Sequence, residues 1–502
     1  MAAVMELRLE QVAREDLVMF VNACFSCTGQ REFYGDARGQ SVSIEFMHQY
    51  ILGNYRRLYA RTLAAGINHF NQAQIILNLL AAGSPASVED RREEGALIAA
   101  TLRALPPPRA WRVLESLRSR HINNRRARAI AREYVAGRAD LAFDAVKYRS
   151  KLRAAVVHGH VKLEGELGPF LIHGWKKRTY TQPLLEAFRK AHFTQEALYE
   201  LPFTVAEGLA VKHGVPRDVF LQRIEPRLTA AERLRLQESA ARSGGKAPPV
   251  DLERASLTKL ALYALALKPE SRRERREELH QALTRAAARV LGRAPVSLGR
   301  VAAVLDDSYS ASGSLEKRRR PLGVAMAAHY LLSTASREYR AFWTCPVEDP
   351  VLVAARGQTD IATPLLEALA WGAELVVIVS DGYDNDPPKA VAELTRVFRQ
   401  KLDPARRTAL VHVNPVFDAE EFSPRSFGTA VPTVGVRDAE DLPTVLGFAR
   451  FAEGAAALAE LEGYLSARVR QWLERDARRR QREAGAGAPP SSEAAHAVEE
   501  GD

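Results

Sequence analysis

Five short apolar or β-branched runs in the C-terminal part of the chain constrain its fold more than any other feature. They are GRVAAVLDD, EYRAFW, ELVVIVSDG, RTALVHVNP and AVPTVGV, and they lie between residues 299 and 436. Helical stretches such as PLGVAMAAHYLLSTASRE separate them. Because buried strands that alternate with helices form a parallel sheet covered on both faces, we predict a doubly wound α/β domain over residues 293–475. A ligand of such a domain would lie beyond the carboxyl ends of its strands.

Oxygen-bearing side chains occur in the loops that follow these runs. Asp306, Ser308 and Ser310 follow the first run with the spacing Asp-x-Ser-x-Ser. Thr359 precedes a predicted helix in RGQTDIATPLLEAL, and Asp381 lies at the end of the third run. Asp and Ser are also ordinary turn residues. Carboxylate and hydroxyl oxygens are, however, the ligands that Mg²⁺ and Mn²⁺ accept, often together with water. We therefore predict a metal site, with Asp307 pointing away because successive strand residues face opposite sides.

Residues 1–290 consist of one helical pattern after another. Segments such as SIEFMHQYILGNYRRLYARTLAAGI carry apolar residues three and four positions apart, and Pro or Gly separates the segments. Such a series indicates stacked helical pairs, so we predict an α-solenoid for residues 1–290. Residues 483–502 contain too few apolar side chains to form a core, and we predict a disordered tail there.

The composition, with 46% hydrophobic and 26% charged residues, is that of an ordinary globular protein. No signal-peptide pattern opens the sequence, and no apolar run is long enough to cross a bilayer, so we expect a cytoplasmic protein without a membrane partner. Cys24 and Cys27 form a lone Cys-x-x-Cys pair. Zinc would require two further ligands, and we expect both cysteines to be buried among helices.

Positive charge is concentrated in residues 101–180. This segment has 18 Lys and Arg residues against six Asp and Glu, a net charge of +12, whereas the whole chain carries +10. A local excess of positive charge indicates a polyanionic ligand. A solvated, Arg-rich helical surface is the alternative interpretation.

The five candidate metal ligands, in this order and strand context, resemble the metal-ion-dependent adhesion site of a von Willebrand factor A domain. The resemblance covers residues 293–475. It implies that the domain binds Mg²⁺ or Mn²⁺ as a cofactor and leaves one coordination position open for an acidic group of a partner protein.

A helical array followed by an A domain resembles the Ro family, in which a ring of HEAT-like helical repeats, the TROVE module, precedes such a domain. The clearest local likeness is RRARAIAREYVAGRADLAFDAVKYRSKLR at 125–153, and ALYALALK at 261–268 is a weaker one. The segment after KYR, AAVVHGHVKL, departs from the family's His-rich pattern, and the first 100 residues match poorly. The resemblance implies that residues 1–290 form the RNA-binding module, with the helices arranged in a ring.

Ro proteins bind single-stranded RNA ends and a small structured Y RNA, so the resemblance implies RNA partners here. Lys and Arg neutralise phosphates, while Tyr148, Trp175 and Tyr180 are candidates for stacking on bases, although such residues more often belong to the core. The predicted RNA-binding residues are Arg125, Arg126, Arg128, Arg132, Lys147, Arg149, Lys151, Arg153, His158, Lys176, Lys177 and Arg178.

We find no phosphate-binding P-loop, His-Glu-x-x-His or Gly-x-Ser-x-Gly motif, and we predict that the protein is not an enzyme. The family resemblance implies a role in RNA quality control, with a Y-like RNA and an exoribonuclease or another acidic protein as partners. The alternative is a metal-dependent adaptor without RNA function, whose A domain binds an acidic partner beside an AAA+ ATPase or in a defence system.

Overall fold

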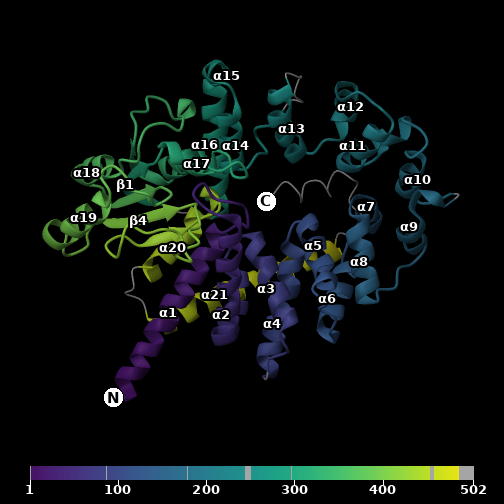
Figure 1. Cartoon of the computed structure of the whole chain (residues 1–502), viewed down its shortest axis with the longest axis horizontal. Coiled ribbons are helices and arrows are strands. Elements are labelled where there is room, and N and C mark those ends of the chain that lie inside the picture. Colours follow the sequence, from purple (N-terminus) through teal and green to yellow (C-terminus); the bar gives the residue numbers. More distant parts are fainter. Residues whose placement is uncertain are drawn as a thin grey trace. The chain divides into compact units, whose positions relative to one another are not determined.

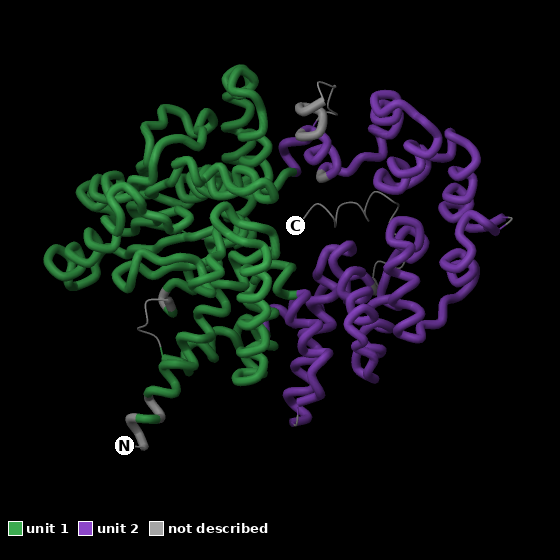
Figure 2. The backbone as a smooth tube through the Cα atoms, in the orientation of Figure 1, with its two compact units in different colours: residues 1–72, 255–469 green, residues 73–254, 470–502 purple. Residues whose placement is uncertain are grey.

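The computed structural model describes residues 2–85, 87–177, 179–243, 250–294, 297–452 and 457–485 (Figure 1). The chain divides into two compact units (Figure 2). Unit 1 contains residues 1–72 and 255–469, and unit 2 contains residues 73–254 and 470–502. This division differs from the predicted boundary near residue 290, because helices from both ends of the 1–290 segment belong to the same unit as the strands.

Unit 1 contains a five-stranded sheet in which all neighbouring strands are parallel. The strands are β1 (Leu298–Leu305), β2 (Ser336–Trp343), β3 (Leu375–Val379), β4 (Ala409–Asn414) and β5 (Thr433–Gly435). They coincide with the five predicted runs, and their order is β2-β1-β3-β4-β5. In a doubly wound sheet of this order, the direction of winding reverses between β1 and β3, which places the ligand crevice at the carboxyl ends of these two strands.

Helices cover both faces of the sheet. Ala302 and Val304 of β1, with Val376 and Ile378 of β3, pack in one core with α18 (Ala362–Ala370) and α19 (Ala390–Val397). Because side chains alternate along a strand, the intervening residues face the opposite side. There α17 (Arg320–Ala335) packs against β1 and β2, and α14 (Leu257–Ala266) and α16 (Arg276–Arg293) pack against α17 (Figure 1).

The N-terminal helices α1 (Ala2–Ser26) and α2 (Ala37–Arg61) also belong to unit 1. The Asn22 side chain donates to the Thr433 carbonyl at 3.0 Å, and the Gly435 backbone N–H donates to Asn22 Oδ1 at 3.3 Å. A Cβ at Gly435 would lie 2.3 Å from the Asn22 carbonyl oxygen, so only glycine fits. These contacts attach α1 to strand β5. Helices α15 (Pro269–Glu274) and α20 (Leu442–Ala452) complete the longer elements of this unit.

The two cysteines of the Cys-x-x-Cys pair are buried, as predicted. Cys24 lies in α1, and Cys27 follows directly after its last residue. Both are free thiols, and Cys27 packs with Ala23, Ile44 and Phe417. Burial raises the pKa of the Cys24 thiol and raises that of Cys27 to about 11. Both thiols are therefore unreactive apolar side chains of the core.

In the described residues of unit 2 every regular element is a helix, as predicted. They are α4 (Val88–Ala104), α5 (Pro107–Ser119), α6 (Arg125–Ala136), α7 (Leu141–Lys147), α8 (Arg149–Gly159), α9 (Leu167–His173), α10 (Pro183–Lys190), α11 (Phe203–Lys212), α12 (Arg217–Ile224) and α13 (Ala230–Ser243). Helix α8 packs against α5 and α6, and α6 packs against α4. Trp111 is fully buried, with the Tyr134 ring edge-on at 5.1 Å. A closed ring stays a prediction.

Two helices contain unit boundaries: α3 (His69–Ala81) and α21 (Leu458–Gly485). Helix α21 includes the first three residues of the predicted tail, and residues 486–502 lie outside the described residues. None of the described helices is long and apolar enough to cross a membrane.

Candidate functional site

The candidate metal ligands begin where β1 and β3 end. Leu305 pairs with Val379 in the parallel register, and the Asp306 N–H donates to the Val379 carbonyl at 3.0 Å. The next residues of the two strands, Asp306 and Ser380, therefore leave the sheet side by side. The sequence placed both segments at strand ends, and the strand order brings them together at the point where the winding reverses.

Hydrogen bonds fix the orientation of the Asp306 carboxylate. The Ser308 backbone N–H donates to its Oδ1 at 2.9 Å, and the Ser380 hydroxyl donates to its Oδ2 at 3.1 Å. Ser380 was not among the predicted site residues, although it directly precedes Asp381 in the sequence. It holds Asp306 against the end of β3.

The two predicted serines connect the carboxylates. The Ser308 and Ser310 hydroxyl oxygens lie 3.2 Å apart, and Ser310 forms a hydrogen bond to Asp381. The Tyr383 backbone N–H donates to Asp381 Oδ1 at 3.0 Å. Asp306, the two serines and Asp381 thus form one continuous cluster of oxygen atoms.

The loop that contains Thr359 is attached to this cluster through its backbone. The Tyr309 N–H donates to the Gly357 carbonyl at 3.1 Å, and the Asn385 N–H donates to the Thr359 carbonyl at 3.3 Å. Thr359 itself is buried. The loop is therefore attached both to the segment after β1 and to the segment after β3.

Asp307 points away from the cluster, which confirms the prediction. Its Oδ1 accepts hydrogen bonds from the Thr344 hydroxyl at 2.7 Å and from the Cys345 N–H at 2.8 Å, beyond the end of β2. Of the two adjacent carboxylates after β1, only Asp306 belongs to the cluster of oxygen atoms.

The buried charge of the site suits a cation. Asp306 and Asp381 are only 4% and 3% exposed, and no salt bridge reaches either of them in the described part of the chain. Burial raises the pKa of Asp306, and burial together with the nearby Asp306 charge raises the pKa of Asp381 to about 7. Two buried carboxylates and three hydroxyl-bearing residues fit a small divalent cation with a preference for oxygen, because such an ion offsets their charge.

The pKa shifts predict how pH affects metal-free protein. Folding raises the pKa of Asp381 from 3.8 to about 7, so between these pH values the folded protein binds one proton more than the unfolded chain. The free energy of unfolding should therefore fall as the pH rises from about 4 to about 7. If the site binds Mg²⁺, as the sequence predicts, the ion would compete with that proton. Adding Mg²⁺ should therefore raise the melting temperature more at about pH 8 than at about pH 5. Thermal unfolding with Mg²⁺ or with EDTA at both pH values measures this, and equal Mg²⁺-induced shifts would contradict it.

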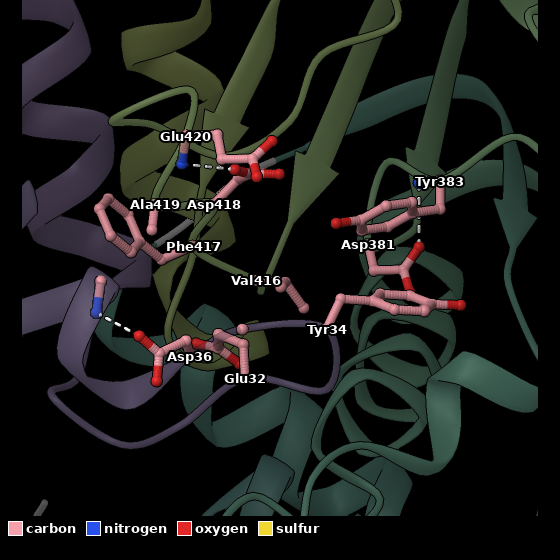
Figure 3. A pocket seen from close by; sticks show the side chains of 12 residues that line it. Glu32, Tyr34, Asp36, Asp381, Tyr383, Val416, Phe417, Asp418, Ala419 and Glu420 are labelled. Atoms are coloured by element: carbon pink, nitrogen blue, oxygen red, sulfur yellow. Dashed lines mark hydrogen bonds between the residues drawn. The ribbon is translucent and has the colours of Figure 1, made fainter.

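Two aromatic rings lie beside Asp381 (Figure 3). Tyr34, from the segment between α1 and α2, packs against Tyr383 with the ring centroids 4.3 Å apart, and the Arg425 guanidinium lies 4.4 Å from the Tyr383 ring. Partial burial and the Asp381 charge raise the pKa of Tyr34, which also forms a hydrogen bond to Ser310. Tyr34 gives no local sequence signal because it lies far from the metal-binding segments along the chain.

A pocket of roughly 350 Å³ opens next to these rings (Figure 3). Its charged lining residues are all acidic: Glu32, Asp36, Asp381, Asp418 and Glu420. Lys317 pairs with Glu32, and Arg425 pairs with Asp418. Without a bound metal ion, the remaining carboxylates leave the pocket acidic, so a group that carries positive charge suits it.

The predicted RNA-binding residues of unit 2 fall into two groups. Arg125, Arg132, Arg153 and Lys176 are exposed, Arg128, Lys147 and Lys151 are half-buried, and Arg178 lies outside the described residues. The second group is held by protein partners: Arg126 by Glu94, Lys177 by Glu166, Arg149 by the carbonyls of residues 170–172, and His158 by the Ile122 carbonyl. In the first group, Arg132 also donates to the Gly159 carbonyl at 3.2 Å, and the Lys147 ammonium lies 5.2 Å from the Phe143 ring. The second group has roles in the helical packing.

Two basic residues that the sequence did not single out lie near Lys151. Burial lowers the pKa of Lys151, and the positive charges of Arg112 and Arg109 on α5 lower it further, while the negative charge of Glu115 on the same helix opposes them. Both arginines are exposed. We call Arg109, Arg112 and Lys151 the α5–α8 basic cluster; its members come from different helices, so only the packing of α5 on α8 reveals it.

The candidate stacking residues differ in exposure. Tyr148 and Tyr180 are buried, and the Tyr180 hydroxyl donates to the Gly174 carbonyl at 2.5 Å. Neither ring therefore has a free face on which a base could stack. Both tyrosines belong to the core, which is the alternative that the sequence analysis left open. Trp175 is half-buried and keeps part of its surface exposed.

No family model matches the chain, and no curated protein matches its sequence. The structure is similar to the crystal structure of the Deinococcus radiodurans RO (RSR) protein, with a TM-score of 0.53 and 15% sequence identity. The match covers 88% of this chain and 100% of that chain. It therefore includes both the helices and the α/β part, and the chain has the fold of a bacterial Ro protein.

Proposed function

We propose that this is an RNA-binding protein of the Ro type, which binds single-stranded RNA ends or a small Y-like noncoding RNA in RNA quality control. The observation that carries the proposal is the fold match along an entire Ro chain. The exposed positive charge of Arg125, Arg132 and Arg153 and the α5–α8 basic cluster support it, because phosphate contacts dominate affinity for RNA.

The metal site would serve a second partner. Asp306, Ser308 and Ser310 would hold Mg²⁺ or Mn²⁺ together with Thr359 and Asp381, directly or through water. When bound, the cation would supply the positive charge that attracts a carboxylate of a partner protein, such as an exoribonuclease. Hydroxyl ligands add no negative charge, so the carboxylates of Asp306 and Asp381 would balance the charge of a divalent cation without exceeding it. We propose binding and not catalysis for this site.

A salt titration tests the RNA proposal. Binding of labelled single-stranded RNA to the full chain, measured by filter retention, should weaken steeply with salt, with log Kobs falling by about 0.7 per decade of salt for each phosphate contact. The RNA should be recovered intact if the protein is not an enzyme. Absent or salt-insensitive binding at micromolar protein would contradict the proposal and favour the adaptor without RNA function.

A further inference from the structure

Three aromatic rings form a group in unit 2 in which Phe193 is exposed and the other two are half-buried; we call it the Trp175 platform: Trp175, His192 and Phe193. Trp175 lies in the short 3-10 helix after α9, and the other two follow α10. The His192 ring stacks on Trp175 with centroids 5.0 Å apart and planes 24° apart, and Phe193 meets Trp175 edge-on at 5.8 Å. The Phe193 side chain is 60% exposed. Most of this ring is therefore available to a ligand.

Positive charge borders the platform. The Lys212 ammonium lies 5.5 Å from the centre of the Trp175 ring, and the Lys176 ammonium lies 5.9 Å from it. Both lysines are exposed. Lys212, at the end of α11, also approaches His192 Nδ1 at 3.4 Å. The platform thus combines an aromatic surface with two exposed cations.

The nearest acidic side chain on α10 is already neutralised. Glu186 binds Arg189 through two hydrogen bonds of 2.8 and 2.7 Å and also accepts the Tyr180 N–H. Arg189 extends towards Phe193, with its guanidinium 6.0 Å from that ring. An anionic ligand at Phe193 would meet no uncompensated carboxylate from this helix.

A single exposed phenylalanine would need no explanation, because isolated apolar residues are common on protein surfaces. Phe193 differs because it belongs to a stacked group that carries two lysines. Exposed rings next to cations are the combination by which proteins bind unpaired bases and the phosphates between them. An acidic peptide would use the lysines but would gain less from an open aromatic face.

We propose that the Trp175 platform is a binding site for an unpaired base of single-stranded RNA, with Phe193 stacking on the base and Lys176 and Lys212 contacting adjacent phosphates. This inference rests on the proposed RNA function and adds to it a specific subsite. It predicts a contribution from bases as well as from phosphates, which the basic residues on α5, α6 and α8 would not provide.

Two oligomers of equal charge separate these contributions. The probes are a labelled oligo(A) of about 12 nucleotides and an abasic oligomer of the same length, within the usual site size for a single strand. Phe193→Ala should weaken binding of oligo(A) about tenfold and leave the abasic oligomer unaffected, whereas Phe193→Tyr should bind as the wild type does. Lys212→Gln should weaken both oligomers and lower the salt slope by about 0.7.

Phe46 on α2 provides the matched control, since it is 56% exposed. Phe46→Ala should bind both oligomers normally, and an equal loss with Phe46→Ala would overturn the inference. Equal affinity of wild type and Phe193→Ala for oligo(A) would overturn the platform while leaving the RNA proposal intact. Failure of the wild type to bind either oligomer would overturn both.

Discussion

Replacing Asp306 by alanine is expected to abolish binding of Mg²⁺ and Mn²⁺ and to leave RNA affinity nearly unchanged. The substitution removes a carboxylate ligand and also the acceptor for the Ser308 N–H and the Ser380 hydroxyl. The predicted RNA contacts belong to unit 2, whereas Asp306 belongs to unit 1. Calorimetric titration with each metal, followed by the RNA titration on the same two proteins, measures both effects.

Asp307→Asn is the matched control for this experiment. The Asp307 carboxylate, next to Asp306 in the sequence, points towards Thr344 and Cys345. An asparagine Oδ1 at this position can accept the same two hydrogen bonds. This variant should bind metal normally. Because burial disfavours a charged Asp306, the Asp306→Ala protein should remain folded without metal. Equal metal affinity in Asp306→Ala and the wild type would show that the segment after β1 is only a polar turn.

Replacing Arg112, Lys151 and Arg153 together by glutamine is expected to reduce affinity for single-stranded RNA by at least about tenfold and to lower the salt slope by about 2. Arg112 and Lys151 lie close enough for their charges to repel, and Arg153 is an exposed residue of α8 two positions after Lys151. Phosphates relieve this repulsion, so the loss should be largest at low salt. Filter binding at several salt concentrations gives both quantities.

The control for this variant removes cations that already have partners. Lys177 pairs with Glu166, and Arg217 pairs with Glu207, both at 3.2 Å near the surface. Exposed pairs of this kind contribute little to stability, so Lys177→Gln with Arg217→Gln should fold normally and keep most of the RNA affinity. If this double variant lost as much affinity as the triple variant, net charge and not the α5–α8 basic cluster would determine binding.

The sheet and most of the oxygen cluster proposed as a metal site could be predicted because their signals are local. Each strand is a short apolar run of its own, and Asp306 and Asp381 follow two of these runs directly. Parallel strands bring their carboxyl ends to one edge, which is enough to expect convergence. Even the orientation of Asp307 follows from the alternation of side chains along a strand.

Contacts between distant segments could not be predicted in the same way. Tyr34 packs against Tyr383, and Asn22 binds Thr433, although each pair is separated by hundreds of residues in the sequence. No local sequence pattern indicates that these residues are partners. The composition of the basic segment 101–180 does not show which of its cations are free to bind RNA. Arg126 pairs with Glu94 from another helix, whereas the adjacent Arg125 is exposed. Only the packing of the helices assigns each cation a partner or leaves it to solvent.

The discontinuity of unit 1 has a consequence for biosynthesis. Helix α1 leaves the ribosome long before Phe417, which covers Ala23 and Cys27 in the finished fold. At translation speeds of about 5–20 residues per second, this interval lasts tens of seconds. Throughout it, α2 can pack on α1, but the part of α1 that contacts Phe417 and β5 lacks its native partner. The nascent chain therefore exposes this apolar surface over a period set by the rate of elongation, and chaperones that bind apolar segments would act there.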